Sequence, residues 1–266
     1  MNPELRDPAE IARIDPESLL FYYGNIHSQA GQDGILAEIF RRLDIKSGTF
    51  VEFGAWDGIY LSNCRLLYEK GWSGVFIEAD FAKYETLCSN YGDEAVCINA
   101  MVGMEPGDRL VDLLQQSGVA PGEVTFVSID VDGRDLEILV NLGFTPPVVL
   151  IEGGFNFSPY FGEPIPNEEA AQNMQQPLAA ICATAAGLGY VPVCFYQDTY
   201  LVRRDLAAAL SAKNAVDLYR DAFCFMPIGF RNWLREMRAN SSVIRALENR
   251  FFGRFSDDPL AYAPTR

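Results

Sequence analysis

Five short apolar runs, separated by helix-like segments, constrain the fold of this chain most strongly. The runs are TFVEF (49–53), GVFIEAD (74–80), AVCIN (95–99), VTFVSIDVD (124–132) and PVVLIEGG (147–154). Nearly continuous apolar runs of this length are typical of strands in a parallel sheet that is buried on both faces. The sequence therefore predicts an α/β fold with a doubly wound, mostly parallel sheet.

The segments between and after these runs carry helical signals. Residues 33–43 place apolar side chains on one face of a helix, and Ser62, Asn63 and Gly71 are candidate caps of the next helix. The same pattern predicts helices near 82–90, 108–116, 134–142 and 177–188. Two further strands follow in 190–205, and we expect them to pair antiparallel at one end of the sheet.

The charge balance limits the partners. With 21 Lys and Arg against 36 Asp and Glu, the formal net charge is -15. Nucleic acids and anionic membranes attract cationic proteins, so we expect neither and favour a small-molecule partner. The start of the sequence has no signal peptide and no run long enough for a membrane span, and six scattered cysteines suggest reduced thiols. We therefore expect a cytoplasmic protein.

Acidic and polar residues stand where the predicted strands end. In an open parallel sheet, ligands bind outside the carboxyl ends of the strands, at the point where strand order reverses. Because neighbouring strands lie only about 4.8 Å apart, these side chains can meet in one crevice. The residues are Glu52, Glu78, Asn99, Asp130 and Glu152.

The loop after the first strand indicates the kind of ligand. Gly54 and Gly58 flank Trp56, so the dinucleotide fingerprint G-x-G-x-x-G is absent, and so is a P-loop. This disfavours a nicotinamide-dependent oxidoreductase and favours a nucleoside without phosphates, such as S-adenosylmethionine. Gly54 would allow close backbone approach, and Glu78 would accept the ribose hydroxyls. Glu52 and Asp57 would orient the polar tail, with Asn99 and Ala100 near the adenine.

Three segments resemble a known family. SQAGQDGIL, GTFVEFGAWDGIYLSNCRLLYEKGWSGVFIEAD and VSIDVDGRDLEIL resemble, in order and spacing, the FkbM-type S-adenosylmethionine-dependent methyltransferases. The resemblance covers residues 28 to about 152. It implies a Rossmann-like class I methyltransferase fold with strand order 3-2-1-4-5-7-6, and methyl transfer to an oxygen, often a hydroxyl of a sugar or secondary metabolite.

The resemblance also implies roles for single residues. The methionine part of the cofactor would lie against Gly54, Ala55, Asp57 and Gly58, and Glu78 would hold the ribose. Gln29 and Asp33 would close over the cofactor, and Asn63 would cap the first helix after the sheet begins. Trp56 departs from the family pattern, where a small or polar residue is usual. The full predicted cofactor set is Gln29, Asp33, Glu52, Gly54, Ala55, Trp56, Asp57, Gly58, Asn63, Glu78, Asp80, Asn99, Ala100 and Asp130.

A hydroxyl acceptor needs a base, and four residues are candidates. They are Asp130, Asp132, Glu152 and the single histidine, His27. The three carboxylates could act directly as the base, bind a divalent ion such as Mg²⁺, or hold the ammonium group of the cofactor. An alternative from another class is a non-catalytic binding or regulatory protein, whose cofactor pocket could be blocked, for instance by Trp56.

The chain divides into three predicted segments. They are an N-terminal helical segment with the cofactor-closing motif (1–32), a Rossmann-like methyltransferase domain (33–205) and a C-terminal helical extension (206–266). The loop 153–172 is predicted to be a binding loop or lid, with Phe155, Phe157, Tyr160 and Phe161 as either a substrate platform or packing. For the basic, aromatic extension we favour packing or homodimerisation over a membrane-surface helix.

Overall fold

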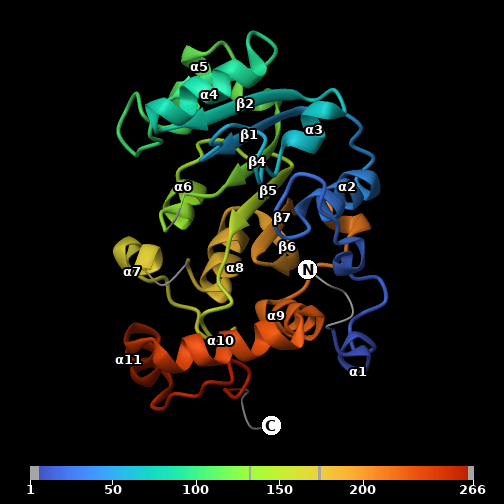
Figure 1. Ribbon diagram of the computed structural model, residues 1–266, viewed down its shortest axis with the longest axis vertical. Helices are drawn as coiled ribbons and strands as arrows, with labels where there is room; N and C mark the ends of the chain where they lie inside the picture. Colours follow the sequence, from blue (N-terminus) through green and yellow to red (C-terminus); the bar gives the residue numbers. More distant parts are fainter. Residues whose placement is uncertain (1–5, 132, 173–174, 263–266) are drawn as a thin grey trace.

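The structure is a computed structural model, and it describes residues 6–131, 133–172 and 175–262. Its centre is a seven-stranded sheet in the order β3-β2-β1-β4-β5-β7-β6 (Figure 1). The strands are β1 (Thr49–Phe53), β2 (Ser73–Glu78), β3 (Val96–Asn99), β4 (Val124–Ile129), β5 (Val148–Glu152), β6 (Tyr190–Tyr196) and β7 (Asp198–Arg203). The strand order implied by the family resemblance is therefore confirmed.

The sheet is mostly parallel. β1 pairs in parallel with β2 and β4, and the parallel pairing continues outward to β3 and β5. β7 runs antiparallel between β5 and β6, as the sequence predicts. Strand order reverses at the β1–β4 pair, because the chain leaves β1 toward β2 and β3 and returns to β4 on the other side of β1. This is the place where a doubly wound sheet leaves a crevice.

Helices cover both faces of the sheet. On one face, Phe50, Phe76 and Phe126 form a buried cluster with side chains of α2 (Gln32–Arg42), α4 (Phe81–Tyr91) and α9 (Ala215–Phe225). On the other face, Val51, Val127 and Val149 pack with α5 (Leu110–Gln116), α6 (Asp135–Val140) and α8 (Leu178–Gly187). Successive strand residues enter opposite clusters, which explains why each strand reads as a continuous apolar run.

Short helices complete the chain. α1 (Pro8–Ile11) and the 3-10 helix η2 (Leu19–Tyr22) precede α2, and α3 (Arg65–Glu69) follows β1. Two further 3-10 turns are η3 (Pro121–Glu123) and η4 (Ala207–Ala209). The segment 153–172, predicted as a loop throughout, ends in the helix α7 (Asn167–Gln172), which is a correction. Among the described residues, no helix is both long and apolar enough to cross a membrane.

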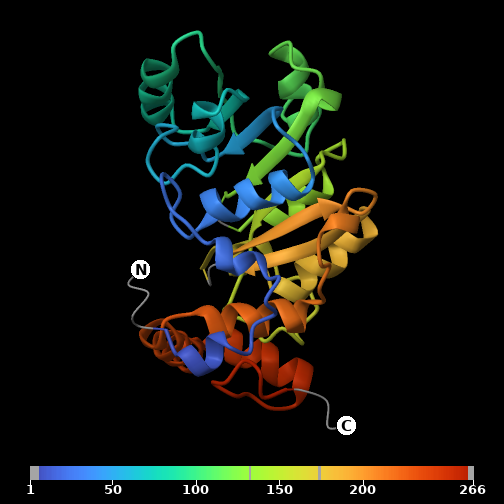
Figure 2. The ribbon, with the colours of Figure 1, turned by 90° about the vertical axis from the view of Figure 1, so that its right-hand side faces the viewer.

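The C-terminal helices α9, α10 (Ile228–Asn240) and α11 (Ser242–Phe252) gather at one end of the molecule, below the sheet in Figures 1 and 2. They hold the segment that follows β5. Tyr219 of α9 donates a hydrogen bond to the carbonyl oxygen of Phe155 at 2.6 Å. Phe157 and Phe161 are buried and stack on each other. These phenylalanines therefore pack inside the protein and do not form a substrate platform.

A buried ion pair fixes the same segment. Arg238 of α10 and Glu248 of α11 are fully buried, and their Nη2 and Oε2 atoms lie 2.7 Å apart. Arg238 also donates to the carbonyl oxygen of Asn156, and Glu248 accepts the backbone N–H of Ser158 at 2.7 Å. The basic extension therefore packs against the rest of the protein, in agreement with the packing interpretation made from the sequence. Homodimerisation through it stays a prediction, as does the division into segments 1–32, 33–205 and 206–266.

Candidate functional site

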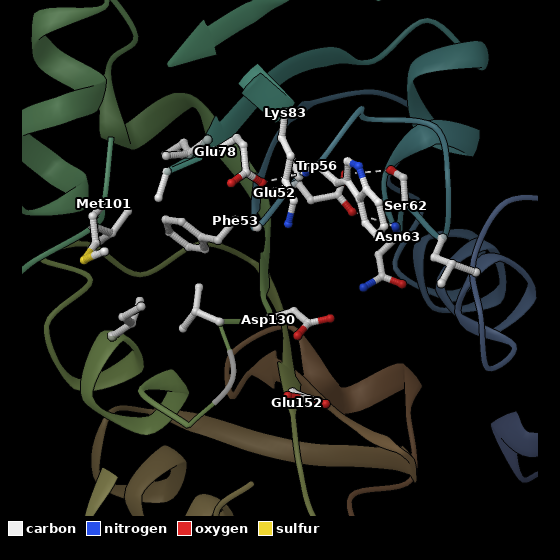
Figure 3. Close-up of a pocket in the computed structure, with 18 of the residues that line it drawn as sticks. Glu52, Phe53, Trp56, Ser62, Asn63, Glu78, Lys83, Met101, Asp130 and Glu152 are labelled. Atoms are coloured by element: carbon white, nitrogen blue, oxygen red, sulfur yellow. Dashed lines mark hydrogen bonds between the residues drawn. The ribbon is translucent and has the colours of Figure 1, made fainter. Parts of the chain in front are cut away.

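A pocket opens at the carboxyl ends of the strands, where strand order reverses. Its volume is about 640 Å³, within the range of about 300–1,000 Å³ that is usual for small-molecule sites. Four carboxylates from the ends of β1, β2, β4 and β5 line it, and Figure 3 shows them in one view. They are Glu52, Glu78, Asp130 and Glu152. Their convergence was expected from the positions of the strand ends in the sequence.

Glu52 is buried beneath the pocket and holds the chain after β1. Its two carboxylate oxygens accept hydrogen bonds from the hydroxyl of Ser62 and the backbone N–H of Asn63, each at 2.6 Å. Burial raises the pKa of Glu52 to about 7, the nearby charge of Asp130 adds to the rise, and the two hydrogen bonds oppose it. Glu52 thus fixes the loop that forms one wall of the pocket.

Asn63 has a different role from the predicted helix cap. α3 begins at Arg65, and the hydroxyl of Ser62 accepts the backbone N–H groups of Cys64 and Arg65. The side-chain amide of Asn63 donates instead to the hydroxyl of Ser128 at 3.1 Å. Its Oδ1 atom is buried and has no hydrogen-bond partner among the described residues. The cap prediction for Asn63 is therefore wrong, and the residue presents an unused acceptor in the wall of the pocket.

The glycines of the first loop serve the backbone. Gly54 has a φ of +60°, and a Cβ atom there would lie 2.6 Å from the carbonyl oxygen of Asp130. Gly58 has a φ of +73°, and a Cβ atom there would meet the ring of Tyr91 at 2.4 Å. Gly54 lines the pocket, whereas Gly58 packs against α4 and does not. Close approach of the loop to neighbouring strands and helices therefore explains both glycines.

Glu78, at the end of β2, links this loop to the next helix. Its carboxylate accepts the backbone N–H of Trp56 at 2.9 Å and that of Asp80 at 2.8 Å. A carboxylate can accept about four hydrogen bonds, so Glu78 retains the capacity to bind a ligand. Asp80 lies outside the pocket lining and caps α4, accepting the N–H groups of Ala82 and Lys83.

Asp130 and Glu152 form the other side of the pocket (Figure 3). Asp130 is exposed at the end of β4, and Glu152 accepts a hydrogen bond from the side chain of Gln175. Buried Asp198 begins β7 nearby, and its carboxylate accepts a hydrogen bond from Gln32 at 2.5 Å. Burial, together with the charge of Asp130, raises the pKa of Asp198 to about 8. The predicted base Asp132 lies outside the described residues.

Of the residues predicted in the N-terminal motif, only one reaches the pocket. Gln29 lines the pocket, whereas Asp33 is buried and accepts the backbone N–H groups of Ile26, His27 and Ser28. His27 lies outside the pocket lining and pairs with Glu69, with Nε2 and Oε2 3.0 Å apart. Asp33 therefore folds the motif, and the structure does not bring His27 to the predicted chemistry.

The predicted cofactor residues thus separate into two groups. Those that line the pocket are Gln29, Glu52, Gly54, Ala55, Trp56, Asn63, Glu78, Ala100 and Asp130; those that do not are Asp33, Asp57, Gly58, Asp80 and Asn99. Other lining residues were not predicted, notably Tyr60, Leu61, Lys83, Met101 and Arg134. Tyr60 and Leu61 lie in the glycine-rich loop after the first strand. Large apolar side chains in such a loop could have indicated a ligand contact.

Metal binding was a further sequence hypothesis. Across residues 6–131, 133–172 and 175–262, no three His, Cys, Asp or Glu side chains are grouped so that they could hold a metal ion. Fold and site together define a Rossmann-like α/β protein with a carboxylate-lined pocket at the point where strand order reverses.

Comparisons with known proteins complete this description. No protein-family model matches the chain, and no curated protein matches it. The resemblance to the FkbM-type family therefore stays a prediction from the motifs.

Solved structures also match the chain, and the three described here do so at low sequence identity. A SAM-dependent methyltransferase from Aquifex aeolicus has 12% identity and a TM-score of 0.38 over 74% of this chain and 96% of its own. A putative S-adenosyl-L-methionine-dependent methyltransferase from Methanococcus maripaludis has 12% identity and a TM-score of 0.39, over 64% and 82%. One from Geobacter sulfurreducens, in complex with S-adenosyl-L-homocysteine, has 14% identity and a TM-score of 0.37, over 92% and 89%.

Proposed function

We propose that this protein is an S-adenosylmethionine-dependent methyltransferase that acts on a hydroxyl group of a sugar or secondary metabolite. The observation that carries the proposal is the convergence of Glu52, Glu78, Asp130 and Glu152 on one pocket at the point where strand order reverses. A phosphate-free, cationic nucleoside suits such a pocket better than a dinucleotide, because its charge complements the carboxylates.

The residues present fit this cofactor. The Oδ1 atom of Asn63 is a buried hydrogen-bond acceptor that has no partner among the described residues. The ammonium group of the cofactor would donate a hydrogen bond to it. Glu78 would hold the ribose hydroxyls, Ala100 would lie near the adenine, and Gln29 would contact the cofactor from the N-terminal side. Asp57 and Gly58 would support the loop without touching the ligand.

The reaction needs a base beside the acceptor. S-adenosylmethionine supplies an activated methyl group on its sulfonium. Asp130 or Glu152 would accept the proton of the acceptor hydroxyl, since both carboxylates line the pocket on the side away from Trp56 and Glu78. A carboxylate can accept this proton without a metal ion. Among the described residues, which do not include Asp132, no three side chains are grouped to hold Mg²⁺.

One form of the non-catalytic alternative is a pocket blocked by Trp56. Trp56 stands at the rim with its side chain about half exposed, and about 640 Å³ remains open beside it. This geometry favours the cofactor-binding proposal over the alternative.

Calorimetric titration with S-adenosylmethionine and S-adenosylhomocysteine tests the proposal. We expect both to bind, and Glu78→Ala to weaken binding by about 1.5–3 kcal/mol, because hydrogen bonds to a charged group are lost. Glu85→Ala is the matched control, since Glu85 is exposed on α4 and lies outside the pocket lining. Thermal unfolding confirms that each variant is folded. No binding of either compound to the wild-type protein would refute the proposal.

A further inference from the structure

Four apolar side chains that line the pocket are also exposed to solvent. Trp56, Tyr60, Leu61 and Met101 line the pocket and are 48%, 60%, 38% and 69% exposed. We name these four residues the collar. Figure 3 shows Met101 and Trp56 on opposite sides of the pocket. Large apolar side chains that are exposed together around a cavity mark a binding surface, because a ligand that covers them removes their surface from water.

The loop that carries most of the collar turns its polar groups inward. The Asp57 carboxylate accepts the backbone N–H groups of Ile59 and Tyr60 at 2.9 and 2.8 Å. The carbonyl oxygen of Asp57 accepts a hydrogen bond from the side chain of Asn90 at 2.9 Å, and that of Gly58 accepts one from Tyr91 at 2.5 Å. These bonds fix the loop while its apolar side chains remain in contact with solvent. The loop that carries Trp56, Tyr60 and Leu61 is thus held in place by the protein itself.

Backbone strain occurs at two collar residues. Trp56 and Leu61 have φ angles of 50° and 58°, in the left-handed region that bulky residues rarely adopt. Glu78 holds the backbone N–H of Trp56, and Leu61 forms an isolated bridge with Ser28. Strain of this kind persists where the surroundings enforce it and is concentrated at ligand-binding sites. Here both residues with this strain line the pocket.

We propose that the collar binds the apolar body of the methyl acceptor, which is therefore a hydroxylated molecule with an alkyl or aromatic body, and not a free sugar. This inference rests on the proposed function and narrows its substrate class. The collar residues line the same pocket as Asp130 and Glu152, so a ligand that spans the pocket contacts the collar at one end and these carboxylates at the other. The net charge of -15 opposes an anionic membrane as the occupant. The phenylalanines after β5 are buried and offer no competing platform.

Alkylphenols are suitable probes, because each carries one hydroxyl on an apolar body. Titrations would use 4-ethylphenol, 4-butylphenol and 4-hexylphenol, with methyl α-glucoside as the polar comparison, at saturating S-adenosylhomocysteine. We expect affinity to rise about three- to fourfold for each methylene that becomes buried, and no measurable binding of the glucoside.

Tyr60→Ser and Met101→Ser test the collar directly. We expect each to weaken 4-hexylphenol binding by about tenfold, since each removes a large apolar contact. In Tyr60→Ser the affinity for S-adenosylhomocysteine should stay within about twofold, since Tyr60 does not belong to the proposed cofactor contacts. Trp233→Ser is the matched control, because Trp233 is 45% exposed on α10 and lies outside the pocket lining. It should leave 4-hexylphenol binding unchanged.

The outcomes separate this proposal from the proposed function. If S-adenosylhomocysteine binds but the alkylphenols do not, or bind equally well to Tyr60→Ser and Met101→Ser, the collar proposal is overturned alone. A different result is that S-adenosylhomocysteine fails to bind while the binding of 4-hexylphenol still depends on Tyr60. The collar would then bind apolar molecules, but the methyltransferase proposal would be refuted, and with it the role of the bound molecule as a methyl acceptor. A third outcome is that the alkylphenols do not bind, while sedimentation shows self-association of the wild type that is lost in Tyr60→Ser. The collar would then be a contact surface for a second copy of the chain.

Discussion

Asp198→Asn should change how the stability of the protein depends on pH. Asp198 is buried at the start of β7, and burial raises its pKa from an ordinary 3.8 to about 8. The folded protein therefore holds this proton more tightly than the unfolded chain does. This proton adds to the free energy of unfolding, and its contribution is complete below about pH 4. The contribution falls by about 1.4 kcal/mol per pH unit as the pH rises toward 8.

The asparagine variant removes this titration and keeps an acceptor for Gln32, whose side chain donates to Asp198 at 2.5 Å. The free energy of unfolding of the variant, minus that of the wild type, should grow by about 2–3 kcal/mol between pH 5 and pH 7. Urea denaturation followed by circular dichroism at both pH values measures the difference. The titration of Glu52 contributes to both proteins and cancels in the subtraction.

Asp93→Asn provides the control, because Asp93 is exposed in the turn after α4. Its difference from the wild type should be the same at pH 5 and pH 7. If the Asp198→Asn difference were also independent of pH, to within about 0.5 kcal/mol, the proton would not be held in the folded state. The argument from burial would then be refuted.

Two further predictions concern stability. Arg238→Met should cost about 3–5 kcal/mol in urea denaturation because it leaves the Glu248 carboxylate buried without its cation, whereas Arg235→Met, which removes a partly exposed residue on the same helix, should cost far less. Gly54→Ala should cost at least about 1 kcal/mol more than Gly71→Ala, since both have positive φ but a Cβ atom meets nearby backbone only at position 54. Equal costs within either pair would contradict the corresponding explanation.

The positions of the strand ends could be predicted from the sequence. Each strand is a short apolar run bounded by polar residues, and burial on both faces leaves little freedom in where such a run ends. Glu52, Glu78, Asp130 and Glu152 were therefore expected at one edge of the sheet, and they line one pocket. The roles proposed for them stay predictions.

The direction of a loop carboxylate could not be predicted in this way. Asp33, Asp57 and Asp80 each stand beside glycines or strand ends, where a ligand contact and a backbone contact have the same sequence signature. In the structure all three accept backbone N–H groups, because short acidic side chains satisfy exposed amides in turns and at helix starts. The two outcomes differ only in the direction of the side chain.

The collar was missed for a related reason. Tyr60 and Leu61 belong to a loop whose glycines suggested ligand contact through the backbone, and Met101 follows a strand where apolar residues are ordinary. Their shared exposure depends on backbone angles, such as the positive φ of Leu61, that the amino-acid pattern does not encode.

The contacts of Arg238 and Glu248 have a consequence for the order of folding. These two side chains bind backbone groups of Asn156 and Ser158, which lie 82 and 90 residues earlier in the chain. Closing so long a loop costs entropy before any contact repays it. The five parallel strands can pair before α10 and α11 have emerged from a ribosome, but Asn156 and Ser158 lack these two partners until then. We expect the stretch around Asn156 and Ser158 to be the last part of the molecule to become ordered.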